Sequence, residues 1–306
     1  MFLITAIGNG PHYIAMINRI LICLDKSTYT DSVIDYACWL AEHHNASLEG
    51  LVVVDAKGIR RSEGAVPLGA MRFAKTSIAA KEKECHELME SILEKFKERC
   101  DAAGVRHTEF EMQGEPAGAI LDESNYFDCM VIGQRTFFTY SSGAGDDEQY
   151  GTDDDIVGNA LSEILNESLA PVFAVPLDWK PTQDAFNVLI GLDSSLNAMR
   201  SLRQFARLYG RAPAKIKVLN CNDDSEASKI MLGKAAKFLE SHGFGDVSGE
   251  THSGSPEKVM TPDYCKPYDL IVLGANSRST LVEFFVGSIT TELIERGDKP
   301  LLIANG

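Results

Sequence analysis

A set of small residues near the C-terminus has the types and the spacing of an anion-binding turn. Gly274, Ser277, Gly287 and Ser288 form the pattern G-x2-S-x9-G-S. Small residues let backbone N–H groups approach phosphate oxygens, and the N-terminus of a helix adds free donors and a favourable dipole. Arg278 is placed to offset phosphate charge. An ordinary strand–turn–helix connection also favours Gly and Ser, so the motif alone leaves both interpretations open.

The pattern differs from two better-known phosphate motifs. It lacks G-K-[ST], so no lysine is built in to activate a terminal phosphate, and it does not follow G-x-G-x-x-G. Two separated clusters suit an elongated polyphosphate better than a single phosphate. The residues therefore favour binding of an anion over transfer of a phosphoryl group, and they single out no catalytic residue.

The elements that must position this turn occur twice, because the chain is a duplication. The matching segments are 19–25 with 187–193, 114–120 with 254–260, 126–133 with 267–274, and 169–176 with 298–305. A polar stretch with two prolines, 176–185, separates the copies. We expect domains over 18–178 and 185–306, preceded by an N-terminal appendage over 1–17.

Each copy alternates apolar strands with helices, which is typical of a doubly wound α/β fold. We expect two tandem domains, each a mostly parallel five-stranded sheet with helices on both faces. In the first copy the expected strands are 19–25, 48–54, 107–112, 128–132 and 171–175, and the expected helices are 32–44, 74–103, one opened by Pro116 and one from Gly158. Ligands of such sheets bind outside the carboxyl ends of the strands, where Asp25, Asp193, Gly133 and Gly274 are expected.

Composition narrows the class of protein. The formal net charge is −15, which argues against a sequence-independent nucleic-acid binder and against an anionic membrane surface. The seven cysteines are odd in number and form no CxxC pair, so a reduced, cytoplasmic compartment fits best. No stretch approaches the roughly 18 apolar residues of a membrane span, and the N-terminus lacks the basic region of a signal peptide.

With these residues in place, the chain resembles a tandem universal stress protein, over about residues 18–306. The nucleotide motif of that family is G-x2-G-x9-G-[ST], and Gly274 to Ser288 departs from it only by Ser277 in place of the second glycine. The resemblance implies that the second half binds ATP, with Mg²⁺ or Mn²⁺ as a companion of the triphosphate, and hydrolyses it slowly or not at all.

The resemblance also implies eight site residues. They are Asp193 and Cys221 beside the adenosine, Gly274, Ser277 and Arg278 in the first phosphate turn, and Gly287, Ser288 and Ile289 in the second.

The first half departs from this motif. Gly133 and Thr136 are followed by 21 residues before Gly158, and Asn159 replaces the hydroxyl residue. The longer loop carries six acids, Asp146, Asp147, Glu148, Asp153, Asp154 and Asp155. Each would repel a nearby phosphate by about 1–4 kcal/mol, so we predict weak or no ATP binding here. A divalent-metal loop is an alternative interpretation of the acids, and a solvated surface loop is the favoured one.

The functional prediction is an ATP-binding stress-response or regulatory protein with adenine nucleotide as its partner. The alternatives are a slow adenosine-nucleotide hydrolase and a scaffold that works without nucleotide. The two halves are expected to pair as an intramolecular pseudo-dimer through the edge strands near 171–175 and 300–304, and a homodimer of two chains is left open.

Overall fold

The computed structural model describes the chain in seven stretches. These are residues 17–55, 71–135, 159–181, 186–193, 195–210, 213–275 and 287–305. The acidic loop, with Thr136 and Gly158, lies outside the described residues, as does the expected appendage before Ile17. Ile17 itself, counted with the appendage, is fully buried in the core.

The elements of the first half follow the expected order. They are β1 (Arg19–Cys23), α1 (Thr30–His44), β2 (Ser47–Val54), α3 (Met71–Ala103), β3 (Arg106–Gln113), α4 (Pro116–Ser124), β4 (Cys129–Gly133), α5 (Asn159–Glu167) and β5 (Val172–Val175). The second half repeats them as β6 (Phe186–Gly191), α6 (Leu196–Tyr209), β7 (Ala214–Cys221), α7 (Ser225–Ser241), β8 (Asp246–His252), α8 (Pro256–Val259), α9 (Pro262–Cys265), β9 (Leu270–Gly274), α10 (Ser288–Arg296) and β10 (Leu301–Ala304). None of the helices in the described stretches has the length and apolar character to cross a membrane.

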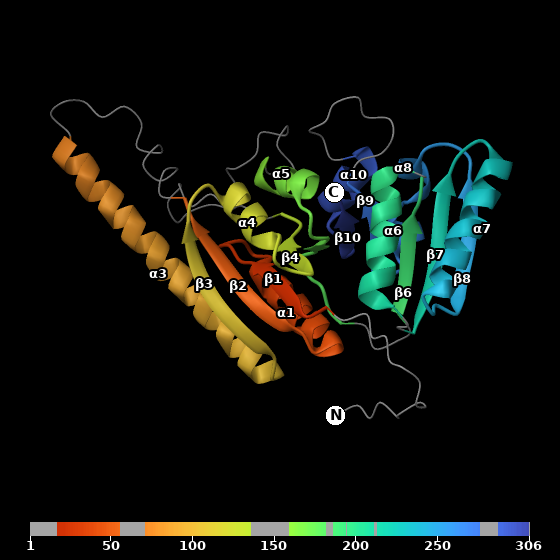
Figure 1. The fold of residues 1–306 in the computed structure, drawn as a ribbon. Coiled ribbons are helices and arrows are strands. Elements are labelled where there is room, and N and C mark those ends of the chain that lie inside the picture. The colour runs from red at the N-terminus through yellow and green to blue at the C-terminus, as the bar shows by residue number, and fades with distance from the viewer. Residues whose placement is uncertain are drawn as a thin grey trace.

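The strands form one ten-stranded sheet in the order β3-β2-β1-β4-β5-β10-β9-β6-β7-β8. Each half supplies five parallel strands, and β5 and β10 pair antiparallel, with Ile303 opposite Val172. Figure 1 shows the two halves side by side, with β3 and β8 at opposite ends. The two tandem doubly wound α/β halves are confirmed, and so is the expected contact between the edge strands near 171–175 and 300–304.

The helices cover both faces of the sheet because successive strand residues point to opposite sides. In β1, Ile20 and Ile22 face a core shared with α1, α3, α6 and α7. Leu21 and Cys23, one residue along, face a second core shared with α4, α5 and α10. In the first half, the apolar runs β1, β2, β4 and β5 are therefore largely buried on both sides, as parallel sheets require, whereas β3 at the edge of the sheet is not.

One helix of the first half is replaced by two short helices in the second. Pro116 and Pro256 each open a helix, as expected at a position whose missing N–H costs nothing. The helix α4 continues for nine residues, whereas α8 has four. The second half turns at Thr261, whose side chain caps α9, because Pro262 cannot continue a helix but suits the start of a new one.

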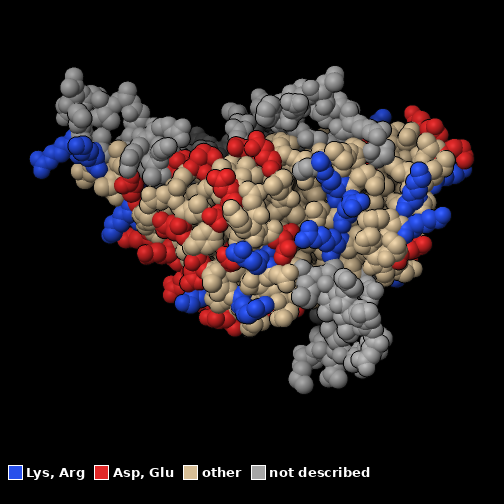
Figure 2. Space-filling view, in the orientation of Figure 1, with Lys and Arg blue, Asp and Glu red and all other residues tan. Residues whose placement is uncertain are grey.

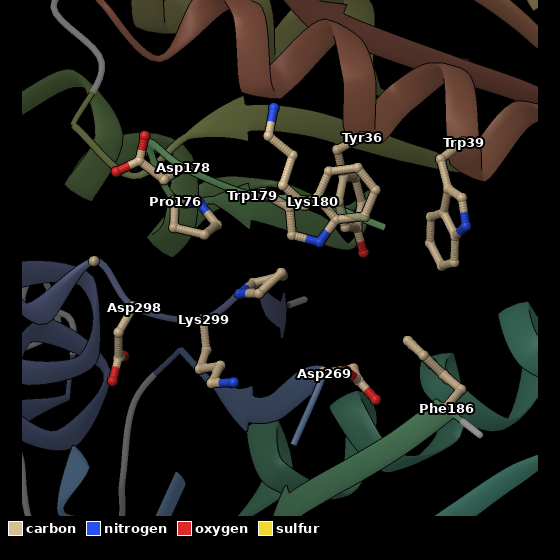
Figure 3. Close-up of a pocket in the computed structure, with 12 residues that line it drawn as sticks. Tyr36, Trp39, Pro176, Asp178, Trp179, Lys180, Phe186, Asp269, Asp298 and Lys299 are labelled. Atoms are coloured by element: carbon tan, nitrogen blue, oxygen red, sulfur yellow. The ribbon is translucent and has the colours of Figure 1, made fainter. Parts of the chain in front are cut away.

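Aromatic side chains of α1, of the segment between the halves and of β6 also pack together where the two halves meet. The ring centroids of Tyr36 and Trp179 are 4.9 Å apart, and those of Trp39 and Phe186 are 5.9 Å apart. These rings border a cavity of about 380 Å³ that also contacts Lys299. Figure 3 shows Tyr36 and Trp39 of α1 on one side of this cavity and Phe186 of the second half on the other. Aromatic packing therefore supplements the strand pairing at the junction.

Candidate functional site

A cavity of about 350 Å³ lies at the carboxyl ends of β6, β7 and β9 in the second half. Six of the eight predicted site residues line it, although they are spread over almost 100 residues of chain. They are Asp193, Cys221, Gly274, Gly287, Ser288 and Ile289. The other two, Ser277 and Arg278, lie outside the described residues. The cavity occupies the place that the topology of a doubly wound sheet reserves for ligands.

The wall next to β6 is shaped by hydrogen bonds that the loop makes to itself. Asp193 Oδ1 accepts a hydrogen bond from the Ser195 backbone N–H at 2.9 Å. Ser195 then caps α6, its Oγ accepting from the Ala198 N–H at 3.2 Å. Asp193 is partly exposed and lines the cavity, so its second carboxylate oxygen has room for a hydroxyl of a ligand.

Gly274 serves packing as well as the cavity. A Cβ at Gly274 would lie 2.6 Å from the Ala198 backbone nitrogen and 2.8 Å from the Asn197 carbonyl carbon. Both neighbours are backbone atoms at the start of α6, so a side chain could not be accommodated without moving the helix. The sequence interpretation assigned this glycine to phosphate approach alone, and the structure adds the close contact of β9 with α6.

The N-terminus of α10 forms the opposite wall. The Gly287 N–H donates to the Ala275 carbonyl at 2.7 Å, and Thr290 Oγ1 donates to the Gly274 carbonyl at 3.1 Å. These bonds tie the start of α10 to the end of β9. The Thr290 hydroxyl is therefore engaged by the backbone.

The first-turn N–H groups of α10, those of Ser288, Ile289 and Thr290, have no acceptor within the helix. They belong to the wall that borders the cavity. A helix N-terminus of this kind attracts an anion through its free donors and its dipole.

Glu257 also lines the cavity, and it was not predicted from the sequence. It lies on α8, and its Oε1 accepts a hydrogen bond from Ser288 Oγ at 2.5 Å. The Ser288 hydrogen bond is the main cause that holds the pKa of Glu257 below its usual value. Burial, with a smaller contribution from the Glu257 charge, raises the pKa of the Cys221 thiol to about 11. The repeat contained a sequence signal for Glu257. The segment "GSPE" at 254–257 matches "GEPA" at 114–117, so the second half has an acidic residue where the first half has alanine.

Charge in the described part of the cavity is entirely negative. Asp193 and Glu257 are the two ionisable carboxylates among its described lining residues, which include neither lysine nor arginine. Within the described stretches, no three His, Cys, Asp or Glu side chains gather in a way that could hold a metal ion.

In the part of the first half that the structure describes, the residues that follow β1 and β4 are bonded to the protein itself. Asp25 is 2% exposed, and its Oδ1 accepts from the Ser27 N–H at 3.1 Å and from Ser27 Oγ at 2.6 Å. The residue after Gly133, Gln134, is fully buried and donates from Nε2 to the Lys299 carbonyl at 2.6 Å. Where the second half has a cavity wall, the first half has a contact between the halves.

Arg135 extends this contact to the far end of α10. Its guanidinium donates to the Glu295 carbonyl at 3.0 Å, close to the C-terminus of the helix, where cations are favourable. The helix whose N-terminus borders the cavity is thus held at its C-terminus by the turn that follows β4.

The halves also differ in charge. Residues 1–178 contain 29 acidic and 14 basic side chains, whereas residues 179–306 contain 15 of each. The whole net charge therefore belongs to the first half. Figure 2 shows acidic side chains outnumbering basic ones over the first half, whereas both signs occur on the visible face of the second. A small anion meets less electrostatic repulsion at the second half.

Comparison with known proteins agrees with this architecture. A family model described as the universal stress protein family matches residues 16–176, more than half of the chain. A universal stress protein of Synechocystis sp. is 22% identical over 296 residues, covering 93% of this chain and 98% of that protein.

Two solved structures share the fold over nearly the full length. A universal stress protein from Archaeoglobus fulgidus has a TM-score of 0.66 at 16% identity, covering 95% of this chain and 97% of its own. A functionally unknown protein from Pseudomonas aeruginosa has a TM-score of 0.53 at 14% identity, covering 95% and 93%. Because the family model matches more than half of its residues, the chain belongs to the universal stress protein family.

Proposed function

We propose that the second half binds ATP in the cavity at the ends of β6, β7 and β9. One observation carries the proposal: six residues expected from the family resemblance, distant in sequence, line a single cavity of about 350 Å³. That volume lies within the range of roughly 300–1,000 Å³ typical of small-ligand pockets. The protein would act as a stress-response or regulatory module whose state depends on nucleotide occupancy.

The walls suggest how the nucleotide would lie. Among the lining residues, Asp193 and Cys221 suit the ribose hydroxyls and the adenine edge. Gly274, Gly287 and Ser288 suit the phosphates, because the first-turn N–H groups of α10 have no acceptor within the helix. Mg²⁺ or Mn²⁺ would arrive bound to the phosphates, since the described residues provide no metal cluster.

We propose that the second half binds ATP and hydrolyses little or none of it. The carboxylate of Asp193 holds its own turn, and that of Glu257 is held by Ser288. The described lining residues also include no lysine or arginine that could stabilise the charge of a transferring phosphoryl group. The alternative, a slow adenosine-nucleotide hydrolase, would show steady ATP consumption by the pure protein, lost with the binding variant described next.

The variant Gly287→Asp tests the site directly. Gly287 is the N-cap of α10 and lines the cavity, so an added carboxylate would occupy the anion position. We expect isothermal titration to show ATP binding by the natural protein and at least about tenfold weaker binding by the variant, a loss of 1.4 kcal/mol or more.

A matched variant on another helix controls for the added charge. Gly233→Asp places a carboxylate at an exposed position of α7, outside the cavity, and should leave ATP affinity unchanged. Equal binding by Gly287→Asp and the natural protein would refute the site. Absence of ATP binding by the natural protein would leave the scaffold that works without nucleotide.

A further inference from the structure

We propose that Glu257 acts as a charge filter in this cavity, disfavouring a free, fully charged triphosphate and admitting one whose charge a divalent cation has reduced. This inference rests on the proposed nucleotide binding and assigns a specificity-determining residue to the site. It arises from the position of one carboxylate at the end of the cavity proposed for the phosphates.

The carboxylate stands where an anionic ligand would be bound. Ser288 opens α10, and its hydroxyl donates to Glu257 Oε1 at 2.5 Å. A helix N-terminus favours a negative charge beside it, and Glu257 supplies that charge from within the protein. A phosphate oxygen that accepts from Ser288 must displace the carboxylate or lie next to it.

Among the lining residues that the structure describes, no basic side chain offsets this charge. Asp193 is the other ionisable carboxylate among the described lining residues, which include no lysine or arginine. After burial, the Glu257 charge is the second cause that raises the pKa of Cys221 on β7. Two like charges in a partly buried site repel strongly, so a cation that reduces the ligand charge beside Glu257 should weaken this repulsion.

The filter is specific to the second half. In the repeat, Ala117 takes the position of Glu257, and Asn159 takes that of Ser288. The first half instead places its acidic residue two positions earlier, where Glu115 caps α4 by accepting from the Ala117 and Gly118 N–H groups. The Glu257–Ser288 pair is therefore a feature of the half that keeps the nucleotide motif, and it is not a helix cap carried over from the duplication.

Three ligands separate charge from shape in the test. The dissociation constants of ATP with EDTA, ATP with Mg²⁺, and adenosine are measured by isothermal titration for the natural protein and for Glu257→Gln. The control is Glu292→Gln, which removes one charge from α10 outside the cavity. We expect Glu257→Gln to bind metal-free ATP about tenfold more tightly than the natural protein does. The gain in affinity should be about threefold or less for Mg·ATP and less than about twofold for adenosine.

Each other result decides against the filter. Unchanged affinity for metal-free ATP in Glu257→Gln would refute it, as would an equal gain in Glu292→Gln. A loss of about tenfold or more for Mg·ATP would show that Glu257 ligates the cation, which also overturns the filter. If the natural protein binds none of the three ligands, the proposed function fails, whereas binding with the wrong dependence on Glu257 refutes the filter alone.

Discussion

At the scale of single residues, Gly274 both lines the candidate site and allows close packing of β9 against α6. Gly274 was predicted from its place in a phosphate turn, and the structure puts it against the backbone of α6, with 2.6 Å between a hypothetical Cβ and the Ala198 nitrogen. Sequence reasoning recognised that the glycine matters, because the motif is local. It could not see the helix contact, since α6 lies about 75 residues away in the chain.

The packing role of Gly274 predicts a loss of stability independent of any ligand. We expect Gly274→Ala to lower the free energy of unfolding by about 1–3 kcal/mol, because the methyl group forces backbone atoms apart. Gly233→Ala is the matched control, since its Cβ meets nothing within 4 Å and α7 should gain up to about 1 kcal/mol. Urea unfolding without nucleotide measures both, and equal stability of the two variants would contradict the packing role.

At the scale of elements, the repeat predicted the strands well and the helices less well. The apolar runs are buried on both faces, which fixes the strands within one or two residues of the expected bounds. Pro256 marked the start of a helix correctly, but the break at Thr261 and the restart at Pro262 were not predicted. That break also shapes the cavity, because Glu257 and Met260 line it.

The helix α4 owes its sharp start to a single side chain. Glu115 accepts from the Ala117 N–H at 3.1 Å and from the Gly118 N–H at 2.7 Å. Removing an N-cap costs roughly 0.5–2 kcal/mol, so we expect Glu115→Ala to lower the stability of the protein by about 1 kcal/mol. Glu123→Ala, on the same helix without a capping role, should change it by less than about 0.5 kcal/mol. Chemical denaturation of both variants checks this, and equal losses would exclude the cap.

At the scale of the whole molecule, the duplication has given two unequal halves of one sheet. The pairing of β5 with β10 followed from the repeat, whereas the Gln134 and Arg135 contacts to the Lys299 and Glu295 carbonyls did not. Such contacts join side chains to backbone groups more than 150 residues away, and no local pattern encodes them. The domain bounds 18–178 and 185–306, and a homodimer of two chains, stay predictions.

The asymmetry of the halves leads to a prediction about stoichiometry. The second half has a cavity lined by six motif residues, while in the first half Asp25 is buried in its own turn and Gln134 is bonded across the junction. The first half also contains the whole excess of acidic residues. One half should therefore bind nucleotide and the other should not.

Native mass spectrometry of the full chain with excess ATP and Mg²⁺ tests this claim most directly. We predict one adenine nucleotide per chain, present in the natural protein and absent from Gly287→Asp at the same ATP concentration. Two nucleotides per chain, none, or one that persists in Gly287→Asp would contradict the account.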